Sequence, residues 1–152
     1  MNRITLALSF VCIAAIAGCT DQPAIFKSSD PALQKSVSQF RDDAATRFPY
    51  KAEAPRTTED KVRAKVEYGI KRLDITNFTG QDLTQVEVWV NRQYVCYVPV
   101  LQDRELKHIE FPMLCNILGA TFPKQNCDVR VEKVELLYAG EFHEIKVNAY
   151  DW

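Results

Sequence analysis

The chain has 152 residues, of which 47% are hydrophobic and 26% are charged, and its formal net charge is −1. This length favours one domain rather than two, and the apolar fraction is sufficient for a modest core. A near-neutral charge without a clustered basic face argues against nucleic acid as a partner. We interpret the densest basic run, residues 61–65, as the solvated side of a strand.

The first eighteen residues have the pattern of a signal peptide. Arg3 provides a positive start, and residues 4–17 form an apolar run that is too short to span about 30 Å of hydrocarbon comfortably. The run ends in Ile16-Ala17-Gly18-Cys19. This segment resembles the lipobox of bacterial lipoproteins, an aliphatic residue and two small residues before the cysteine that receives the lipid. The resemblance implies cleavage before Cys19 and a covalent diacylglycerol and fatty acid on Cys19, with no other cofactor.

The same resemblance implies an address in the cell envelope and a lipid bilayer as a partner through Cys19. Gram-negative lipoproteins that stay in the inner membrane usually carry aspartate directly after the lipidated cysteine, whereas here Thr20 follows. We therefore expect the periplasmic face of the outer membrane if the source is Gram-negative. Ordinary secretion remains an alternative, because Ala15-Ile16-Ala17 also fits the small-x-small cleavage rule. An uncleaved anchor is the third interpretation.

Residues 19–29 predict a lipidated tether, and residues 30–48 predict one amphipathic helix. Asp30 is a good N-cap and Pro31 a good first helical residue. One apolar stripe at helical spacing comprises Leu33, Val37, Phe40, Ala44 and Phe48. The stripe fits packing on the domain's own sheet or docking on a partner. An interfacial membrane helix is least favoured, because the polar face is not rich in basic residues.

Residues 49–62 predict a linker, and residues 63–152 a small antiparallel β-sandwich, which makes the fold mainly β. From residue 65 hydrophobic residues alternate with a period of two, and a break at Lys71-Arg72 suggests a bulge. A turn is expected at 77–82, and a long strand at 129–138. The stretch 73–83 followed by Val86-Glu87-Val88 resembles the opening of immunoglobulin-like domains in bacterial surface proteins, which implies an immunoglobulin-like sandwich.

No catalytic or metal-binding constellation is recognisable. His108 and His143 each lie near a glutamate, but no further His or Cys has the spacing of a zinc site. No nucleophile elbow and no glycine-rich phosphate loop occur. We expect a non-enzymatic binding or scaffolding module for an envelope protein or polymer. The alternatives are an accessory or inhibitory subunit of an envelope enzyme or transporter, docked through the helix, and an enzyme of unknown class.

Three cysteines remain after Cys12 leaves with the signal peptide and Cys19 takes the lipid. The envelope favours disulfides, and Cys115 and Cys127 bracket the least regular segment. We predict that these two residues pair, closing a loop of about 12 residues that is worth up to about 3 kcal/mol. Cys96 is either an exposed reactive thiol or a small apolar residue of the core.

Trp89 and Tyr94 are the candidate partner-binding residues. A two-residue turn at Asn91-Arg92 would pair them on one face of a hairpin. Their rings are then either covered by Phe40 or Phe48 of the helix, or exposed as an aromatic platform for a ligand. A three-residue turn would instead place Trp89 opposite Val95, and Tyr94 on the other face.

Overall fold

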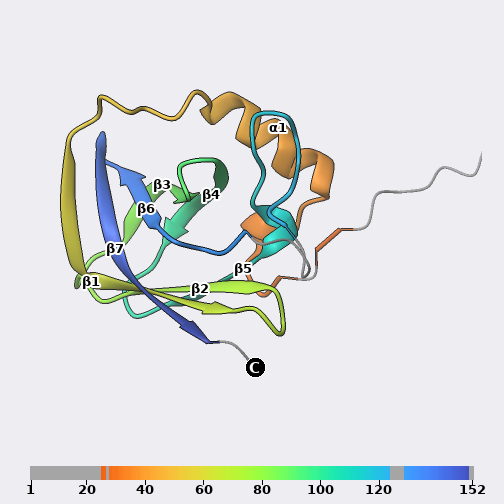
Figure 1. The fold of residues 1–152 in the computed structure, drawn as a ribbon. Helices are drawn as coiled ribbons and strands as arrows, with labels where there is room; N and C mark the ends of the chain where they lie inside the picture. The colour runs from red at the N-terminus through yellow and green to blue at the C-terminus, as the bar shows by residue number, and fades with distance from the viewer. Residues whose placement is uncertain (1–24, 27, 124–128, 151–152) are drawn as a thin grey trace, which may run out of the picture.

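The computed structural model of this chain describes residues 25, 26, 28–123 and 129–150 (Figure 1). The expected signal peptide and Cys19 lie outside the described residues. A 3₁₀-helix η1 (Pro31–Leu33) and helix α1 (Val37–Arg47) come first. The strands and a second 3₁₀-helix are β1 (Arg56–Glu67), β2 (Arg72–Asn77), β3 (Leu83–Val90), β4 (Tyr94–Leu101), β5 (Leu106–Glu110), η2 (Phe111–Met113), β6 (Val134–Tyr138) and β7 (Glu141–Tyr150).

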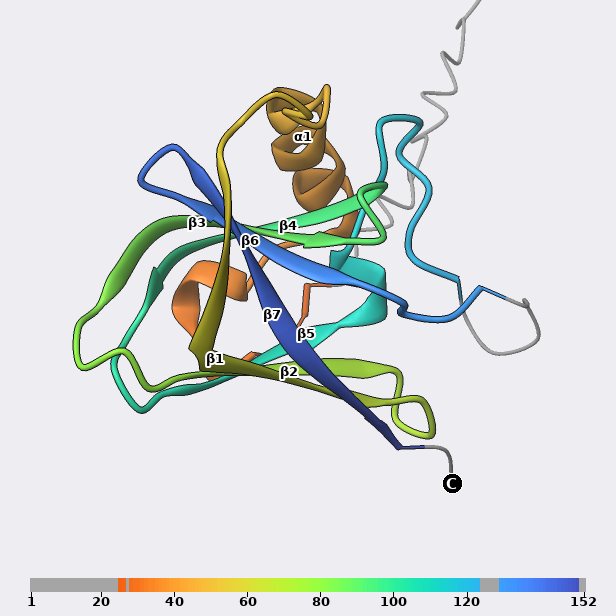
Figure 2. The same ribbon diagram turned by 60° about the vertical axis from the view of Figure 1, so that its left-hand side comes forward.

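The prediction of a mainly β fold is confirmed. The seven strands form one sheet in the order β4-β3-β6-β7-β1-β2-β5, which curls until it is nearly closed and barrel-like (Figures 1 and 2). The prediction of a purely antiparallel sheet was wrong, because β1 and β7 run side by side in the same direction. All other neighbouring strands are antiparallel.

Strand β1 begins well before residue 63, inside the expected linker 49–62. Residues 56–59 pair with β7 alone, and after a shift of register residues 62–67 lie between β7 and β2. In the second half of β1, Val62, Ala64 and Val66 alternate and are buried, but the alternation expected from residue 65 onward stops at Glu67, where the strand ends. The first half is largely solvent-exposed, so its sequence shows no buried face from which a strand could be recognised.

Two other predicted strands differ from the observed ones. The phase break at residues 71–72 is a hairpin turn rather than a bulge, since Lys71 donates its backbone N–H to the Tyr68 carbonyl and has a φ of 57°. The strand expected over 129–138 is confined to β6, because the Asn91 side chain takes the backbone groups of residues 130, 132 and 133. The turn at 77–82 and the one at 139–140 are confirmed.

The expected helix over 30–48 is two elements. Asp30 caps η1 through a 2.8 Å hydrogen bond from Ala32, and Pro31 is its first residue as predicted. This helix ends after a single turn. α1 then begins at Ser36, whose hydroxyl accepts from the Gln39 backbone while the Gln39 side chain accepts from the Ser36 backbone. This capping box is a helix start in its own right, and the sequence analysis overlooked it.

Helix α1 packs on the domain, against β4, with Phe40 and Ala44 buried. Of the interpretations of the apolar stripe, packing on the domain's own sheet is therefore confirmed. The end of the expected tether also attaches here. Ile25 pairs with Ser36, and the Phe26 ring lies edge-on to Phe40 at 5.7 Å between centroids.

Residues 29–32 line a hollow together with residues of β4 and β5, the first and last strands in the sheet order (Figure 2). Leu33 is fully buried, and the Asp30 carboxylate binds the ammonium of Lys107, which is itself buried on β5. Pro99 lies in β4, an edge strand as its sequence predicted. Covering the edges in this way satisfies the need to protect unpaired strand backbone from other chains.

None of the helices in the described residues has the length and hydrophobicity that a membrane span requires.

Candidate functional site

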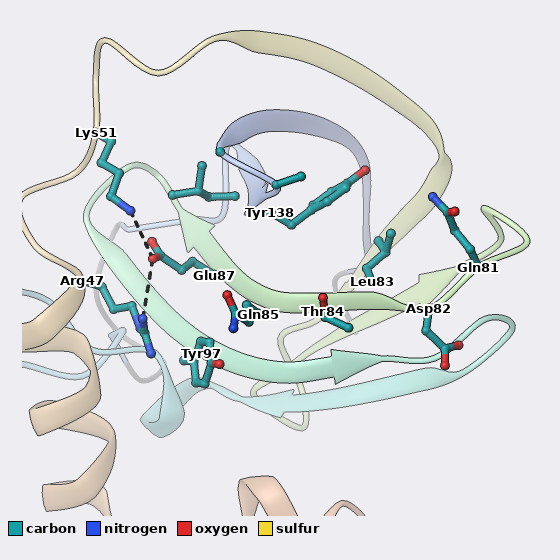
Figure 3. A pocket seen from close by; sticks show the side chains of 13 residues that line it. Arg47, Lys51, Gln81, Asp82, Leu83, Thr84, Gln85, Glu87, Tyr97 and Tyr138 are labelled. Carbon is teal, nitrogen blue, oxygen red and sulfur yellow. Dashed lines mark ion pairs between the residues drawn. The ribbon is translucent and has the colours of Figure 1, made fainter.

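An open groove of about 710 Å³ lies on the outer face of β3, β4 and β6 (Figure 3). Its floor is a row of three residues in register across these strands, Tyr97, Glu87 and Leu137. The end of α1 and the segment after it border one side with Arg47 and Lys51. The β2–β3 turn and the β6–β7 turn border the rest, with Gln81, Asp82, Leu83, Thr84, Gln85, Tyr138, Ala139 and Gly140.

Glu87 is a buried carboxylate at the floor of this groove, only 6% exposed. Its Oε2 accepts a 2.9 Å hydrogen bond from the indole N–H of Trp89, which fixes the side chain. Its Oε1 lies 3.9 Å from Arg47 and 3.5 Å from Lys51. Both distances exceed those of a direct charge-assisted hydrogen bond, so the two cations retain donors for another acceptor.

Arg47 is held in a fixed orientation. Its guanidinium lies over the Tyr97 ring, 3.8 Å from the centroid, an arrangement that suits a planar cation. The Nε of Arg47 is buried without a hydrogen-bond partner in the described residues. Lys51 is more exposed by comparison, with 56% of its side chain accessible to solvent. Arg47 therefore presents an oriented planar guanidinium and Lys51 a single ammonium charge, both beside the Glu87 carboxylate.

Backbone strain occurs at the groove wall. Gln85 has a φ of 54°, a left-handed conformation that costs a non-glycine residue energy and often marks functional sites. It lies where β3 faces Pro99, which has no N–H to donate to the ladder. The exposed Gln85 side chain therefore lines the groove, and the regular alternation of the strand is interrupted at this residue.

A second buried carboxylate lies on the same sheet face. Glu135 is 2% exposed and pairs in register with Trp89. Tyr50 donates to it at 2.5 Å and Arg56 at 2.6 Å, while Arg92 and Lys133 lie within 3.6 Å. Burial and the bond to Glu135 raise the pKa of Tyr50, so its hydroxyl stays a donor. With the groove, this face has five cations around the three carboxylates of Glu87, Glu135 and Glu144, which leaves a local excess of positive charge.

The predicted pairing of Trp89 with Tyr94 was wrong. Asn91 and Arg92 do form the turn with positive φ, closed by the Gln93 N–H, but Gln93 is an extra residue before the ladder resumes. Val90 therefore pairs with Tyr94, and Trp89 with Val95. The cause is the tertiary anchoring of Asn91 on residues 130–133, which no local pattern reveals.

Trp89 is fully buried, so it offers no exposed platform. Phe48 and Tyr50 cover its ring edge-on, at 4.9 and 5.0 Å between centroids. This agrees with the interpretation that Phe48 covers the Trp89 ring. Tyr94 lies on the opposite face against Phe122.

The sequence analysis missed Arg47, Lys51 and Glu87 as site residues. The only available signal was a glutamate in an otherwise apolar strand.

The two histidines do not meet. His108 lies on the edge strand β5, with its Nδ1 2.7 Å from Asp74, and no hydroxyl or thiol in the described chain donates to it. His143 is stacked on Tyr138 at 3.9 Å, and burial lowers its pKa. Among the described residues, no group of three or more His, Cys, Asp or Glu side chains is arranged to hold a metal ion.

Of the three cysteines of the domain, the structure describes Cys96 and Cys115. Cys96 is buried and faces the core beside Val88, and burial raises the pKa of its thiol, so it is a core residue rather than an exposed reactive one. Cys115 is also buried, burial raises the pKa of its thiol to about 11, and no disulfide joins it to another described cysteine. Cys127 lies outside the described residues, so the Cys115–Cys127 disulfide stays a prediction.

Comparisons with protein-family models, with curated proteins and with solved structures found no match to this chain.

Proposed function

We propose that this protein is a lipid-anchored, non-enzymatic binding module of the cell envelope, and that its groove holds an acidic segment of an envelope protein. The observation that carries the proposal is the oriented pair Arg47 and Lys51 at the mouth of a large open groove. The lipobox at residues 16–19 supports the anchor.

The chemistry of the groove favours a carboxylate. A guanidinium fork recognises a carboxylate in bidentate fashion, and a lysine beside it adds a point charge. The buried Glu87 keeps the two cations in place without neutralising both, since one carboxylate faces two positive charges. The Gln85 amide and the Tyr138 ring add contacts suited to a polypeptide backbone and its side chains.

We further propose that the sheet is an immunoglobulin-like sandwich whose first strand bridges its two layers. In such a fold strands A, B and E form one layer, and G, F, C and C′ form the other. The order β1-β2-β5 and the order β7-β6-β3-β4 correspond to these layers if the strands are lettered along the chain. The register shift within β1 lies where an A strand would pass between layers.

Binding of a fluorescein-labelled oligoglutamate peptide, followed by fluorescence anisotropy at low salt, tests the groove. We expect Arg47→Gln and Lys51→Gln each to weaken binding about tenfold, since a charge-assisted hydrogen bond contributes about 1.5–3 kcal/mol. Lys146→Gln is the charge-matched control, because Lys146 is exposed on β7 and does not line the groove.

Equal losses in all three variants would show unspecific attraction to a cationic protein and contradict the proposal. An unchanged affinity in all three variants would also contradict the proposal. Thermal unfolding of each variant shows whether a loss of binding has a structural cause.

A further inference from the structure

Two large aliphatic side chains project from a turn near the point where the described chain begins. Leu118 is 87% exposed and Ile117 is 60% exposed. Turn tips are ordinarily built from polar residues and glycine, and adjacent exposed aliphatic residues mark contact with an apolar environment. No other neighbouring pair of large hydrophobic residues in the described chain is exposed to this degree.

The turn is rigid rather than loose. The Asn116 carbonyl accepts from the Gly119 N–H at 2.9 Å, and the Asn116 side chain accepts from the backbone of Leu118 and Ala120 at 3.0 and 2.9 Å. Gly119 supplies the positive φ of 72° that the turn requires. These bonds hold the backbone of the turn, and both side chains point away from the domain, as their exposure shows. They are displayed to solvent at a fixed place.

The turn lies on the side of the molecule where the N-terminal segment joins the domain. A Cβ added to Gly119 would meet the Arg41 side chain at 3.4 Å, so the turn rests against the first half of α1. Ile25, itself 63% exposed, pairs with Ser36 at the start of the same helix. The basic side chain of Arg41 is exposed beside the apolar tip.

The distance from the lipid to this side is short. Because Ile25 is attached to the domain, only five residues, a span of six Cα–Cα steps, separate it from Cys19. At about 3.5 Å per residue, this segment reaches at most about 21 Å, instead of the ~35 Å expected for a tether that ends at residue 29. A lipid on Cys19 therefore keeps the α1 side of the domain close to the bilayer.

We propose that Ile117 and Leu118 insert into the interface of the lipid bilayer that holds the Cys19 anchor. This inference rests on the proposed lipid anchor. The apolar tip enters the headgroup and acyl boundary, and Arg41 faces the lipid phosphates beside it, the combination by which surface segments bind anionic membranes. The tip adds a second point of attachment, so the domain is held in one orientation and does not swing freely.

Quenching by brominated lipids tests this contact. The mature lipidated protein with Leu118→Trp is incorporated into vesicles of phosphatidylethanolamine and phosphatidylglycerol, with and without bromine on the acyl chains. Phe78→Trp is the matched control, since Phe78 is a 49% exposed aromatic residue on the β2–β3 turn. We expect brominated lipid to quench the Leu118→Trp protein at least twofold more than the wild type, and the Phe78→Trp protein no more than the wild type.

A third variant separates insertion of the turn from the affinity of the new tryptophan for membranes. Adding Ile117→Asn to Leu118→Trp should reduce the extra quenching, and unchanged quenching would overturn the proposal. Equal quenching at positions 118 and 78 would also overturn it and assign the tip to a protein partner. If the lipidated protein fails to sediment with vesicles at all, the anchor itself fails, and the inference fails with it. Sedimentation without quenching contradicts the tip alone.

Discussion

Trp89 shows how one side chain joins the helix side of the domain to its sheet. It has no exposed surface, two aromatic rings pack on its edges, and its N–H binds the buried Glu87. Loss of the ring would leave a cavity and also release the carboxylate that organises the groove. The position therefore contributes to stability and to the proposed binding site together.

We expect Trp89→Ala to lower the free energy of unfolding by about 3–5 kcal/mol, the usual cost of truncating a buried aromatic residue. Urea denaturation followed by circular dichroism measures this loss. Leu118→Ala is the control, because that side chain is 87% exposed and its truncation should change stability by less than about 0.5 kcal/mol. A loss below about 1 kcal/mol for Trp89→Ala would contradict the burial described above.

At the scale of elements, the segment 28–36 closes the space between β4 and β5 through one buried ion pair. Lys107 is 4% exposed and contacts Asp30 and Glu105. Burial alone would raise the pKa of Asp30, but the hydrogen bonds from Lys107 and from the Ala32 backbone, together with the Lys107 charge, outweigh it and hold that pKa below its usual value. Burial lowers the pKa of Lys107, but the hydrogen bonds that it donates to Asp30 and Glu105, together with their negative charges, outweigh burial and raise that pKa.

We expect Asp30→Asn to lower the free energy of unfolding by about 2 kcal/mol at neutral pH, within the range for a hydrogen bond to a charged group. Asparagine keeps the N-cap, so the change removes only the charge. Because the pKa of folded Asp30 is depressed, its contribution is present above the unfolded value of about 3.9 and disappears as pH falls through the folded value. Urea midpoints at pH 7 and at pH 3 should therefore differ less for the variant than for the wild type.

Asp42→Asn serves as the control for this measurement, since Asp42 is exposed on α1 and is not part of the ion pair. The Lys107 contribution has the opposite sign with pH. It is present below the unfolded pKa of about 10.4 and is lost as pH rises through the higher folded value. An acid dependence that Asp30→Asn leaves unchanged would show that the segment is held by other contacts.

The sequence revealed the elements whose signals are local. Alternating valines identified β3, and Pro99 identified an edge. The errors arose where contacts between distant segments determine the register or the extent of a strand. Asn91 set the β3–β4 register by binding residues 130–133, and the exposed first half of β1 is a strand only because β7 lies beside it. The groove cations were unpredictable for the same reason, since α1 brings Arg47 to Tyr97 from fifty residues away.

At the scale of the whole molecule, the proposed anchor makes a direct prediction. Replacing Cys19 with Ser should abolish metabolic labelling by a fatty acid and move the protein from the membrane to the soluble fraction, because nothing else in the proposal binds the bilayer durably. The tip at residues 117–118 alone is too small to retain the chain. Unchanged membrane partition of Cys19→Ser would contradict the lipoprotein assignment. Wild-type protein carried through the same fractionation is the reference.

The parallel pairing of β1 with β7 has a consequence for how the chain acquires its structure. Arg56 and Phe142, which pair there, are 86 residues apart in sequence. Bringing such distant segments together costs about 4 kcal/mol of loop-closure entropy before any contact compensates for it. Folds dominated by such distant pairings form slowly. If the chain is exported as proposed, its emerging N-terminal strands stay exposed to chaperones and proteases until β7 has followed them across.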